Sequence, residues 1–179
     1  MPPVYLLPGW QDSGPGHWQS LWEQQHGDTR VVQDDWLWPR RGDWMARLDE
    51  VLLADERLLQ TPALLAAHSL GCLLVAAWAA HSRHTARVAG ALLVAPPDTE
   101  REDFPPQLAG WRPIPRAPLP FASVAVLSSD DPFGAAGRMR GIASGWGSRL
   151  IDAGPRGHLN AESGLGDWPE ARTWLLGLA

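Results

Sequence analysis

The chain has 179 residues and a formal net charge of −5, and this length suits a single domain over residues 1–179. At this size, folding buries about 70% of the surface of the unfolded chain, so the core needs neither disulfides nor a structural metal. All 15 basic residues are scattered arginines, which together with the negative net charge argues against nucleic acid as the main partner. A single cysteine and the lack of a signal peptide predict a cytoplasmic protein.

Apolar runs alternate with helical patterns along the chain, and turn residues separate them. The runs predict six short strands, over residues 4–7, 29–32, 63–67, 88–95, 122–128 and 149–152. The segments between them predict helices over residues 17–26, 43–59, 70–82, 133–143 and 167–176. The proline-rich segment 96–120 predicts a long loop or a partial cap. We therefore expect an α/β fold, a mainly parallel sheet of about six strands with helices on both faces.

The most informative motif is Ala-His-Ser-Leu-Gly at residues 67–71, between the third predicted strand and an apolar helix. A serine between small residues at such a turn is typical of a nucleophile elbow, which projects the hydroxyl toward a histidine. Ala67 stands where this motif usually has glycine and adds only one methyl group. A chance Ser-x-Gly in a helix is the alternative. A membrane span over residues 62–80 is another, although Ser69 interrupts the apolar run.

Candidate partners of Ser69 follow two later strands, in the chain order serine, acid, histidine that this elbow accompanies. Asp131 follows the fifth predicted strand and His158 follows the sixth. The carboxyl ends of parallel strands lie at one edge of the sheet, so we expect these side chains to meet there. Ser69 would attack an acyl carbon, His158 would take and return its proton, and Asp131 would orient His158. Asp130 and Asp98 are the alternative acids.

An acyl-transfer site also needs two N–H groups that stabilise the oxyanion. We expect one from Leu70, directly after the nucleophile, and one from Trp10, in the loop after the first strand. Trp10, His17, Trp18 and Trp111 are the candidate substrate-binding residues. The competing interpretation places the tryptophans in the core.

Other reactive side chains receive structural interpretations. His68 adjoins Ser69 and should point away from it, as a packing or hydrogen-bonding residue, and Cys72 is expected to be a small buried hydrophobe. No group of His, Cys and carboxylate residues has the spacing of metal ligands. The loop at residues 8–10 lacks the further glycines of a dinucleotide site, so neither a metal nor a cofactor is expected.

Taken together, these segments resemble the small α/β-hydrolases of the YdeN-like family, which includes the retinoblastoma-binding serine hydrolases. The matching segments extend over nearly the whole chain: Leu-Pro-Gly-Trp at 7–10, Gly-His-Trp at 16–18, Ala-His-Ser-Leu-Gly-Cys at 67–72, Ser-Asp-Asp-Pro-Phe at 129–133 and Gly-His-Leu-Asn at 157–160. The resemblance implies a compact hydrolase without a large lid, and it assigns the catalytic roles to Ser69, Asp131 and His158. It implies no particular substrate.

We therefore expect a carboxylesterase-like serine hydrolase that cleaves an ester, thioester or small amide through an acyl-enzyme. Its partner would be a small-molecule substrate, with no nucleic acid and no membrane insertion. A binding or scaffold protein that keeps the fold without turnover is one alternative, and an acyltransferase that uses the same residues is another. The sequence leaves the oligomeric state open.

Overall fold

The computed structural model describes residues 1–179 and contains one sheet of six strands, all parallel. The strand order is β2-β1-β3-β4-β5-β6. The strands are β1 (Val4–Leu7), β2 (Thr29–Arg30), β3 (Ala63–His68), β4 (Val88–Val94), β5 (Ala122–Leu127) and β6 (Arg149–Asp152). The long apolar strands β3 and β4 lie in the centre, where both of their edges are paired. The predicted fold class is confirmed.

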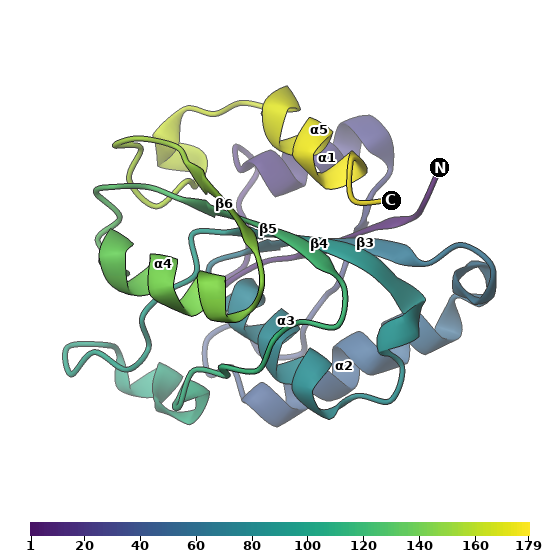
Figure 1. Ribbon diagram of the computed structural model, residues 1–179, viewed down its shortest axis with the longest axis horizontal. Helices are drawn as coiled ribbons and strands as arrows, with labels where there is room; N and C mark the ends of the chain where they lie inside the picture. The colour runs from purple at the N-terminus through teal and green to yellow at the C-terminus, as the bar shows by residue number, and fades with distance from the viewer.

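Helices cover both faces of this sheet. In Figure 1, α1 and α5 lie on one face, and α2, α3 and α4 lie on the other. The α-helices are α1 (Trp18–His26), α2 (Arg41–Ala54), α3 (Leu70–His81), α4 (Ala136–Gly145) and α5 (Pro169–Leu176). Short 3₁₀ helices occur at η1 (Glu56–Leu59), η2 (Thr85–Arg87), η3 (Pro106–Trp111) and η4 (Ala161–Ser163).

The two-residue period of the strands divides the core into two parts. In β1, Tyr5 and Leu7 pack into the larger core beneath α2, α3 and α4, whereas Val4 and Leu6 pack into the smaller core beneath α1 and α5. Nine of the 12 residues of α3 are buried. The apolar segment 62–80 is therefore a central strand followed by a buried helix, and no helix has both the length and the apolar composition needed to cross a membrane.

Several predicted boundaries differ from the structure. The second strand is two residues long instead of four. Thr29 and Arg30 are in register with Tyr5 and Leu6 of β1, and the Val31 N–H makes the last hydrogen bond to this strand, to the Leu6 carbonyl at 2.9 Å. The helix predicted over 43–59 ends at Ala54, since the extended Asp55 accepts a hydrogen bond from the Arg57 N–H and begins η1. The helix predicted over 133–143 is α4, which begins at Ala136 and ends at Gly145.

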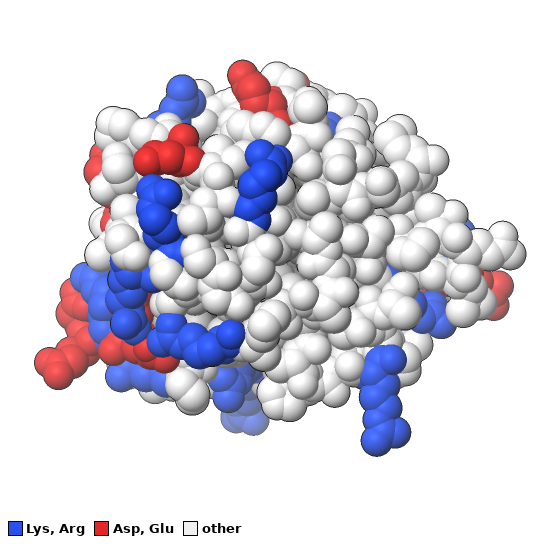
Figure 2. All heavy atoms as spheres, viewed as in Figure 1, with Lys and Arg blue, Asp and Glu red and all other residues white.

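The proline-rich segment 96–120 is folded against the larger core. It contains η3, and Leu108, Trp111 and Ile114 are buried in that core. Arg138 of α4 pairs with Asp98 and Glu100 at the start of the segment. In the surface view of Figure 2, basic and acidic side chains are intermixed at the corner where α4 meets this segment. These contacts fix the segment beside the carboxyl edge of the sheet.

Candidate active site

Ser69 occupies a sharp turn between β3 and α3. Its backbone has φ 54° and ψ −121°, a conformation that a residue with a side chain rarely adopts and that raises the free energy by about 1–3 kcal/mol. The turn is held by two hydrogen bonds, from the Ser69 N–H to the Val94 carbonyl at 2.9 Å and from the Cys72 N–H to the Ser69 carbonyl at 2.9 Å. Such a turn is the backbone of a nucleophile elbow.

The small residues of the elbow motif are explained by close backbone approaches. A Cβ atom at Gly71 would lie 2.2 Å from the Leu7 carbonyl oxygen, so only glycine fits where α3 passes the end of β1. A Cβ atom at Gly9 would lie 2.9 Å from Cβ of Ser69. Ala67 lies within β3, where its single methyl group is fully buried, so the alanine is accommodated without a positive φ.

The structure brings Ser69, His158 and Asp131 together at the carboxyl edge of the sheet. His158 Nε2 lies 2.8 Å from the Ser69 hydroxyl oxygen, and His158 Nδ1 lies 2.9 and 3.0 Å from the two oxygens of Asp131. An ionised carboxylate only accepts hydrogen bonds, so Nδ1 carries the proton of the neutral ring and Nε2 accepts from the serine. The side chains of His158 and Asp131 are 10% and 5% exposed, which shields this pair from water.

The alternative acids lie elsewhere. Asp130 accepts hydrogen bonds from the Ser128 hydroxyl at 2.9 Å and from the Gly157 N–H at 2.8 Å. The Gly157 N–H and the Ser128 hydroxyl hold the pKa of Asp130 below its usual value. Asp98 pairs with Arg138 at 2.5 Å. Among these carboxylates, only Asp131 bonds to the His158 ring.

The backbone on both sides of His158 is held by side chains. Asp130 accepts from the N–H of Gly157, and Nε2 of His68 donates to the carbonyl of His158 at 2.9 Å. Burial, and then the nearby His17 and His158 rings, keep the pKa of His68 well below its usual value. His68 is therefore neutral and remains a hydrogen-bond donor, and it links the elbow to the histidine loop.

His17 does not line the cavity beside Ser69, so its predicted role in substrate binding is not retained. It is 4% exposed and caps α1, with its Nδ1 accepting a hydrogen bond from the Gln19 N–H at 3.1 Å. Its ring packs edge-on against His68, with the ring centres 4.6 Å apart. Burial, followed by the charge of Arg30 and by His158, lowers the pKa of His17 to about 3.

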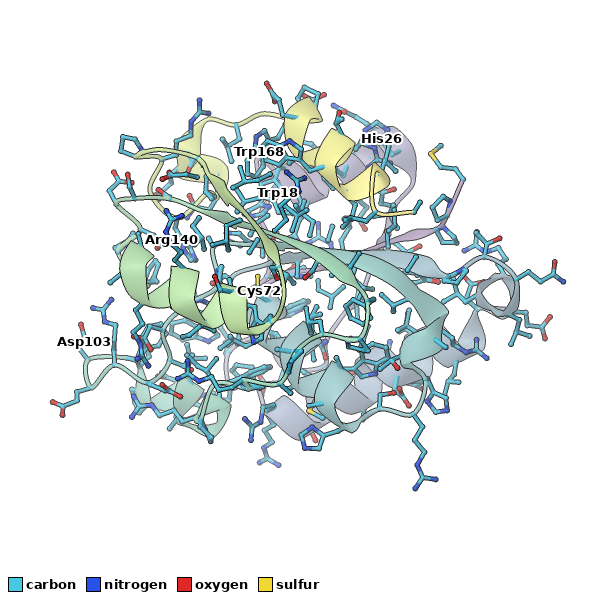
Figure 3. All side chains as sticks on the ribbon, in the orientation of Figure 1. Trp18, His26, Cys72, Asp103, Arg140 and Trp168 are labelled. Atoms are coloured by element: carbon cyan, nitrogen blue, oxygen red, sulfur yellow. The ribbon has the colours of Figure 1, made fainter.

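Trp18 and Trp111 also belong to the core, and their prediction as substrate-binding residues is wrong. Each is 1% exposed. The Trp18 indole donates to the Leu159 carbonyl at 3.1 Å, and its ring packs against Trp168, as the view between α1 and α5 in Figure 3 shows. The Trp111 indole donates to a backbone carbonyl at 2.8 Å and packs against the ring of Trp44. A buried indole N–H that has found a carbonyl partner is typical of a core tryptophan.

A cavity of about 250 Å³ opens beside Ser69. Trp10 lines it, and the Trp10 indole is fixed by a hydrogen bond of 2.9 Å to the Leu37 carbonyl. Most of the remaining wall was not predicted from the sequence. That wall is largely apolar and includes Pro97, Phe104, Pro105, Leu108 and Phe133, with Gln11 and Asn160 as its polar members.

The two missed phenylalanines shape the wall next to the histidine. The Phe133 ring lies edge-on to His158, with 4.6 Å between the ring centres, and it also contacts Phe104 at 6.4 Å. Phe133 follows the Asp131-Pro132 pair in the sequence, and Phe104 is an isolated aromatic residue in the charged part of segment 96–120. Both were visible as apolar residues in polar surroundings, which is the signal that could have identified them.

The backbone N–H groups of Trp10 and Leu70 take no part in any loop, turn or cap hydrogen bond. Both residues line the cavity together with Ser69. Leu70 is the first residue of α3, and the N–H groups at a helix start have no partner within the helix and carry a partial positive charge. The neighbouring Gln11 N–H donates to the Trp36 carbonyl at 3.1 Å, which fixes the loop that carries Trp10.

The one cysteine of the chain is close to this site but not accessible from it. Cys72 is fully buried in α3, as labelled in Figure 3, and its Sγ lies 3.3 Å from the Val94 carbonyl oxygen. Burial raises the pKa of its thiol well above the usual value. The structure contains no group of three or more His, Cys, Asp or Glu side chains arranged to hold a metal ion.

The six-stranded parallel sheet and the serine elbow at its carboxyl edge define an α/β-hydrolase. A family model described as serine hydrolase matches residues 4–176, and the chain belongs to this family. The protein is a serine hydrolase. A search of curated proteins finds no match.

Solved structures with a similar fold include further hydrolases. A YdeN-like hydrolase from Pectobacterium atrosepticum is 29% identical with a TM-score of 0.84, and the match covers 98% of this chain and 89% of that one. The YdeN product of Bacillus subtilis is 20% identical with a TM-score of 0.72, covering 99% and 98% of the two chains. A carboxylesterase from Bacillus cereus is 14% identical with a TM-score of 0.61, covering 99% and 89%. The predicted resemblance to YdeN-like hydrolases is confirmed.

Proposed function

We propose that the enzyme cleaves carboxylic esters through an acyl-enzyme, with Ser69 as the nucleophile. His158 is the general base and acid, and Asp131 orients its ring and stabilises its protonated form. The observation that carries this proposal is the continuous line of hydrogen bonds from the Ser69 hydroxyl through His158 to Asp131 at the mouth of the cavity.

Acylation follows from this arrangement. The Ser69 oxygen attacks the carbonyl carbon of the ester, and its proton moves to His158 Nε2. The negative oxygen that forms is stabilised by the N–H groups of Trp10 and Leu70. The bond to the leaving group then breaks, and the departing oxygen takes the proton from Nε2. In deacylation, a water molecule attacks the acyl carbon in the same way and Ser69 leaves.

The apolar wall indicates which acyl groups this site accepts. A water molecule occupies about 30 Å³ in the liquid, so a cavity of about 250 Å³ has room for a short chain or a flat ring. The rings of Phe104 and Phe133 pack against each other in the wall of this cavity, and Phe133 also packs against His158. Short or flat acyl groups should therefore be cleaved faster than long chains. Thioesters and small amides with such acyl groups belong to the same class of substrate.

A fluorophosphonate probe tests the assignment of the nucleophile. We expect one adduct per chain on Ser69, found by intact-mass measurement and peptide mapping, and we expect Ser69→Ala to abolish both the adduct and ester cleavage. Ser129→Ala serves as the matched control and should leave labelling in place. A label on Ser128 or Ser129 would contradict the proposal, and a chain that takes no label would favour a scaffold role.

Acyl transfer is distinguished from hydrolysis by the products. When an ester is turned over in water that contains a competing alcohol or amine, a hydrolase releases mainly the free acid. An acyltransferase gives mainly the new ester or amide. Mass spectrometry of the products separates these two activities of the same acyl-enzyme.

A further inference from the structure

A second hollow adjoins the cavity beside Ser69, here called the acyl cavity, and the two meet at His158. It has a volume of about 540 Å³, and Phe133, His158 and Asn160 line both spaces. Ser69 and the N–H donors of Trp10 and Leu70 belong only to the acyl cavity. The rest of the second hollow is formed by Pro132 and by residues 155–157 and 162–163, around the loop that carries His158.

The polar groups of this hollow are free to bind a ligand. The guanidinium of Arg156 and the carboxylate of Glu162 make neither a hydrogen bond nor an ion pair with the rest of the protein. Asn160 uses its side-chain oxygen to accept from the Glu162 N–H, which leaves its NH₂ group available. The hollow therefore offers donors and an acceptor, with one positive and one negative charge.

The position of this hollow beside His158 relates it to the departure of the leaving group. His158 Nε2 returns the proton to the leaving group, so the departing oxygen must lie within hydrogen-bond reach of this ring. The acyl group occupies the cavity that contains Ser69. The second hollow shares the wall of Phe133, His158 and Asn160 with that cavity. We propose that this hollow binds the leaving group and selects uncharged alcohols that carry further hydroxyl groups, an inference that rests on the function proposed above.

The charge balance of the hollow supports an uncharged leaving group. A cationic group would be attracted by Glu162 and repelled by Arg156. An anionic group would be attracted by Arg156 and repelled by Glu162. Hydroxyl groups donate to Glu162 and accept from Arg156 and Asn160, so a polyol satisfies all of these side chains at once. An unbranched hydrocarbon satisfies none of them and gains little from an open polar surface.

Two butyrate esters that differ only in the leaving group test this proposal. Glyceryl butyrate and propyl butyrate form the same acyl-enzyme, and glycerol is propanol with two added hydroxyl groups. We expect kcat/KM to be about tenfold higher for the glyceryl ester, since each added hydroxyl gains a hydrogen bond that is made only before the leaving group departs. Because deacylation is common to both esters, the second-order rate constants of acylation, measured in single turnovers below saturation, should show the same ratio, and the deacylation rates should not differ.

Single variants assign the effect to the hollow. Arg156→Ala and Glu162→Ala should each reduce the ratio of the two kcat/KM values by about threefold to fivefold. Arg149→Ala and Glu56→Ala remove the same charges at exposed positions away from the hollow, at the start of β6 and in η1, and they should leave the ratio unchanged.

Distinct outcomes would overturn this inference and the function on which it rests. Equal kcat/KM values for the two esters, or a ratio that Arg156→Ala and Glu162→Ala do not change, would overturn the leaving-group site while leaving the hydrolase assignment intact. Faster cleavage of butyrylcholine than of glyceryl butyrate would show that the hollow selects a cation. Failure to cleave any ester, together with no fluorophosphonate adduct on Ser69, would overturn the proposed function itself.

Discussion

The two halves of the candidate active site are held in place by different forces. The elbow that carries Ser69 is fixed within the backbone, by two backbone hydrogen bonds and by close packing at Gly71 and Gly9, where there is no room for a Cβ atom. The loops that carry Asp131 and His158 follow β5 and β6, and besides one backbone hydrogen bond they are joined by the side chains of Ser128 and Asp130, which accept from the N–H groups of Arg156 and Gly157. This difference implies that changes at the elbow alter stability first, whereas changes in the acid and base loops alter turnover with the fold intact.

The largest expected effect is on turnover and comes from the acid. Asp131→Asn should lower kcat by up to about ten-thousand-fold, because the amide no longer selects the His158 tautomer that accepts the Ser69 proton. The midpoint of urea unfolding should change little. Ester kinetics and urea titration of the same preparation check both parts. If Asp130→Asn has the larger effect on kcat, the acid has been assigned to the wrong residue.

The largest expected effect on stability comes from the elbow. Gly71→Ala would place a Cβ atom 2.2 Å from the Leu7 carbonyl oxygen and should lower the free energy of unfolding by about 3 kcal/mol or more. The same change at Gly141 in α4 meets nothing within 4 Å and should raise it by about 0.5–1 kcal/mol, because alanine favours a helix. Urea unfolding of both variants measures the sign of each change in the free energy of unfolding. Equal changes in the two variants would contradict the steric explanation for Gly71.

A smaller effect concerns the buried imidazoles that join the two halves. His17 and His68 have lowered pKa values when folded, so the unfolded chain binds more protons below its usual histidine pKa of about 6.5. The part of the free energy of unfolding that depends on these two histidines is therefore fully present above about pH 6.5. It is lost as the pH falls toward the folded pKa of His17, about 3. Each of the two histidines should contribute a slope of about 1.4 kcal/mol per pH unit in this window.

His17→Asn isolates one of these contributions, because asparagine caps a helix as histidine does here but does not titrate. Urea unfolding from pH 6 to 4 should then show a slope smaller by about 1.4 kcal/mol per pH unit. Slopes that are the same in the variant and the wild type would show that His17 is protonated in the folded protein.

The smallest expected effect is on kcat and comes from Asp130, which positions the loop of His158 and does not contact its ring. Asp130→Ala removes the oxygen that accepts from the Gly157 N–H and should lower kcat about tenfold with little change in KM, since the histidine loop is less firmly placed. Asp130→Asn keeps an oxygen at this position and should restore most of the rate. Steady-state kinetics of the pair measure this rescue. A variant that loses stability and leaves kcat unchanged would indicate a structural role alone.

The features that the sequence predicted are those set by local pattern. The apolar runs gave the six strands, and the turn at Ser69 could be recognised because its small residues are consecutive in the chain. The placement of Asp131 and His158 followed from the rule that parallel strands end at one edge. The sixth strand agrees with its predicted bounds, because its pattern and its turn residues coincide.

The features that the sequence did not predict depend on packing between distant segments. Trp18 packs against Trp168, which is 150 positions further along the chain, so the sequence left open whether Trp18 belongs to the core or to the substrate site. Phe104 and Leu108 reach the acyl cavity only because segment 96–120 folds back against the sheet. The hydrogen bond between His68 and His158 joins residues 90 positions apart and likewise has no local signal.

The inaccessible thiol of Cys72 has a practical consequence for spectroscopy. Maleimide and iodoacetamide reagents need an exposed thiolate, and this side chain is fully buried with a raised pKa. The native chain should therefore stay unmodified under conditions that label an exposed thiol completely. A cysteine introduced at one surface position beside the cavity would carry a single fluorophore or spin label without first removing Cys72, so the mobility of that position could be followed during turnover in an otherwise unaltered enzyme.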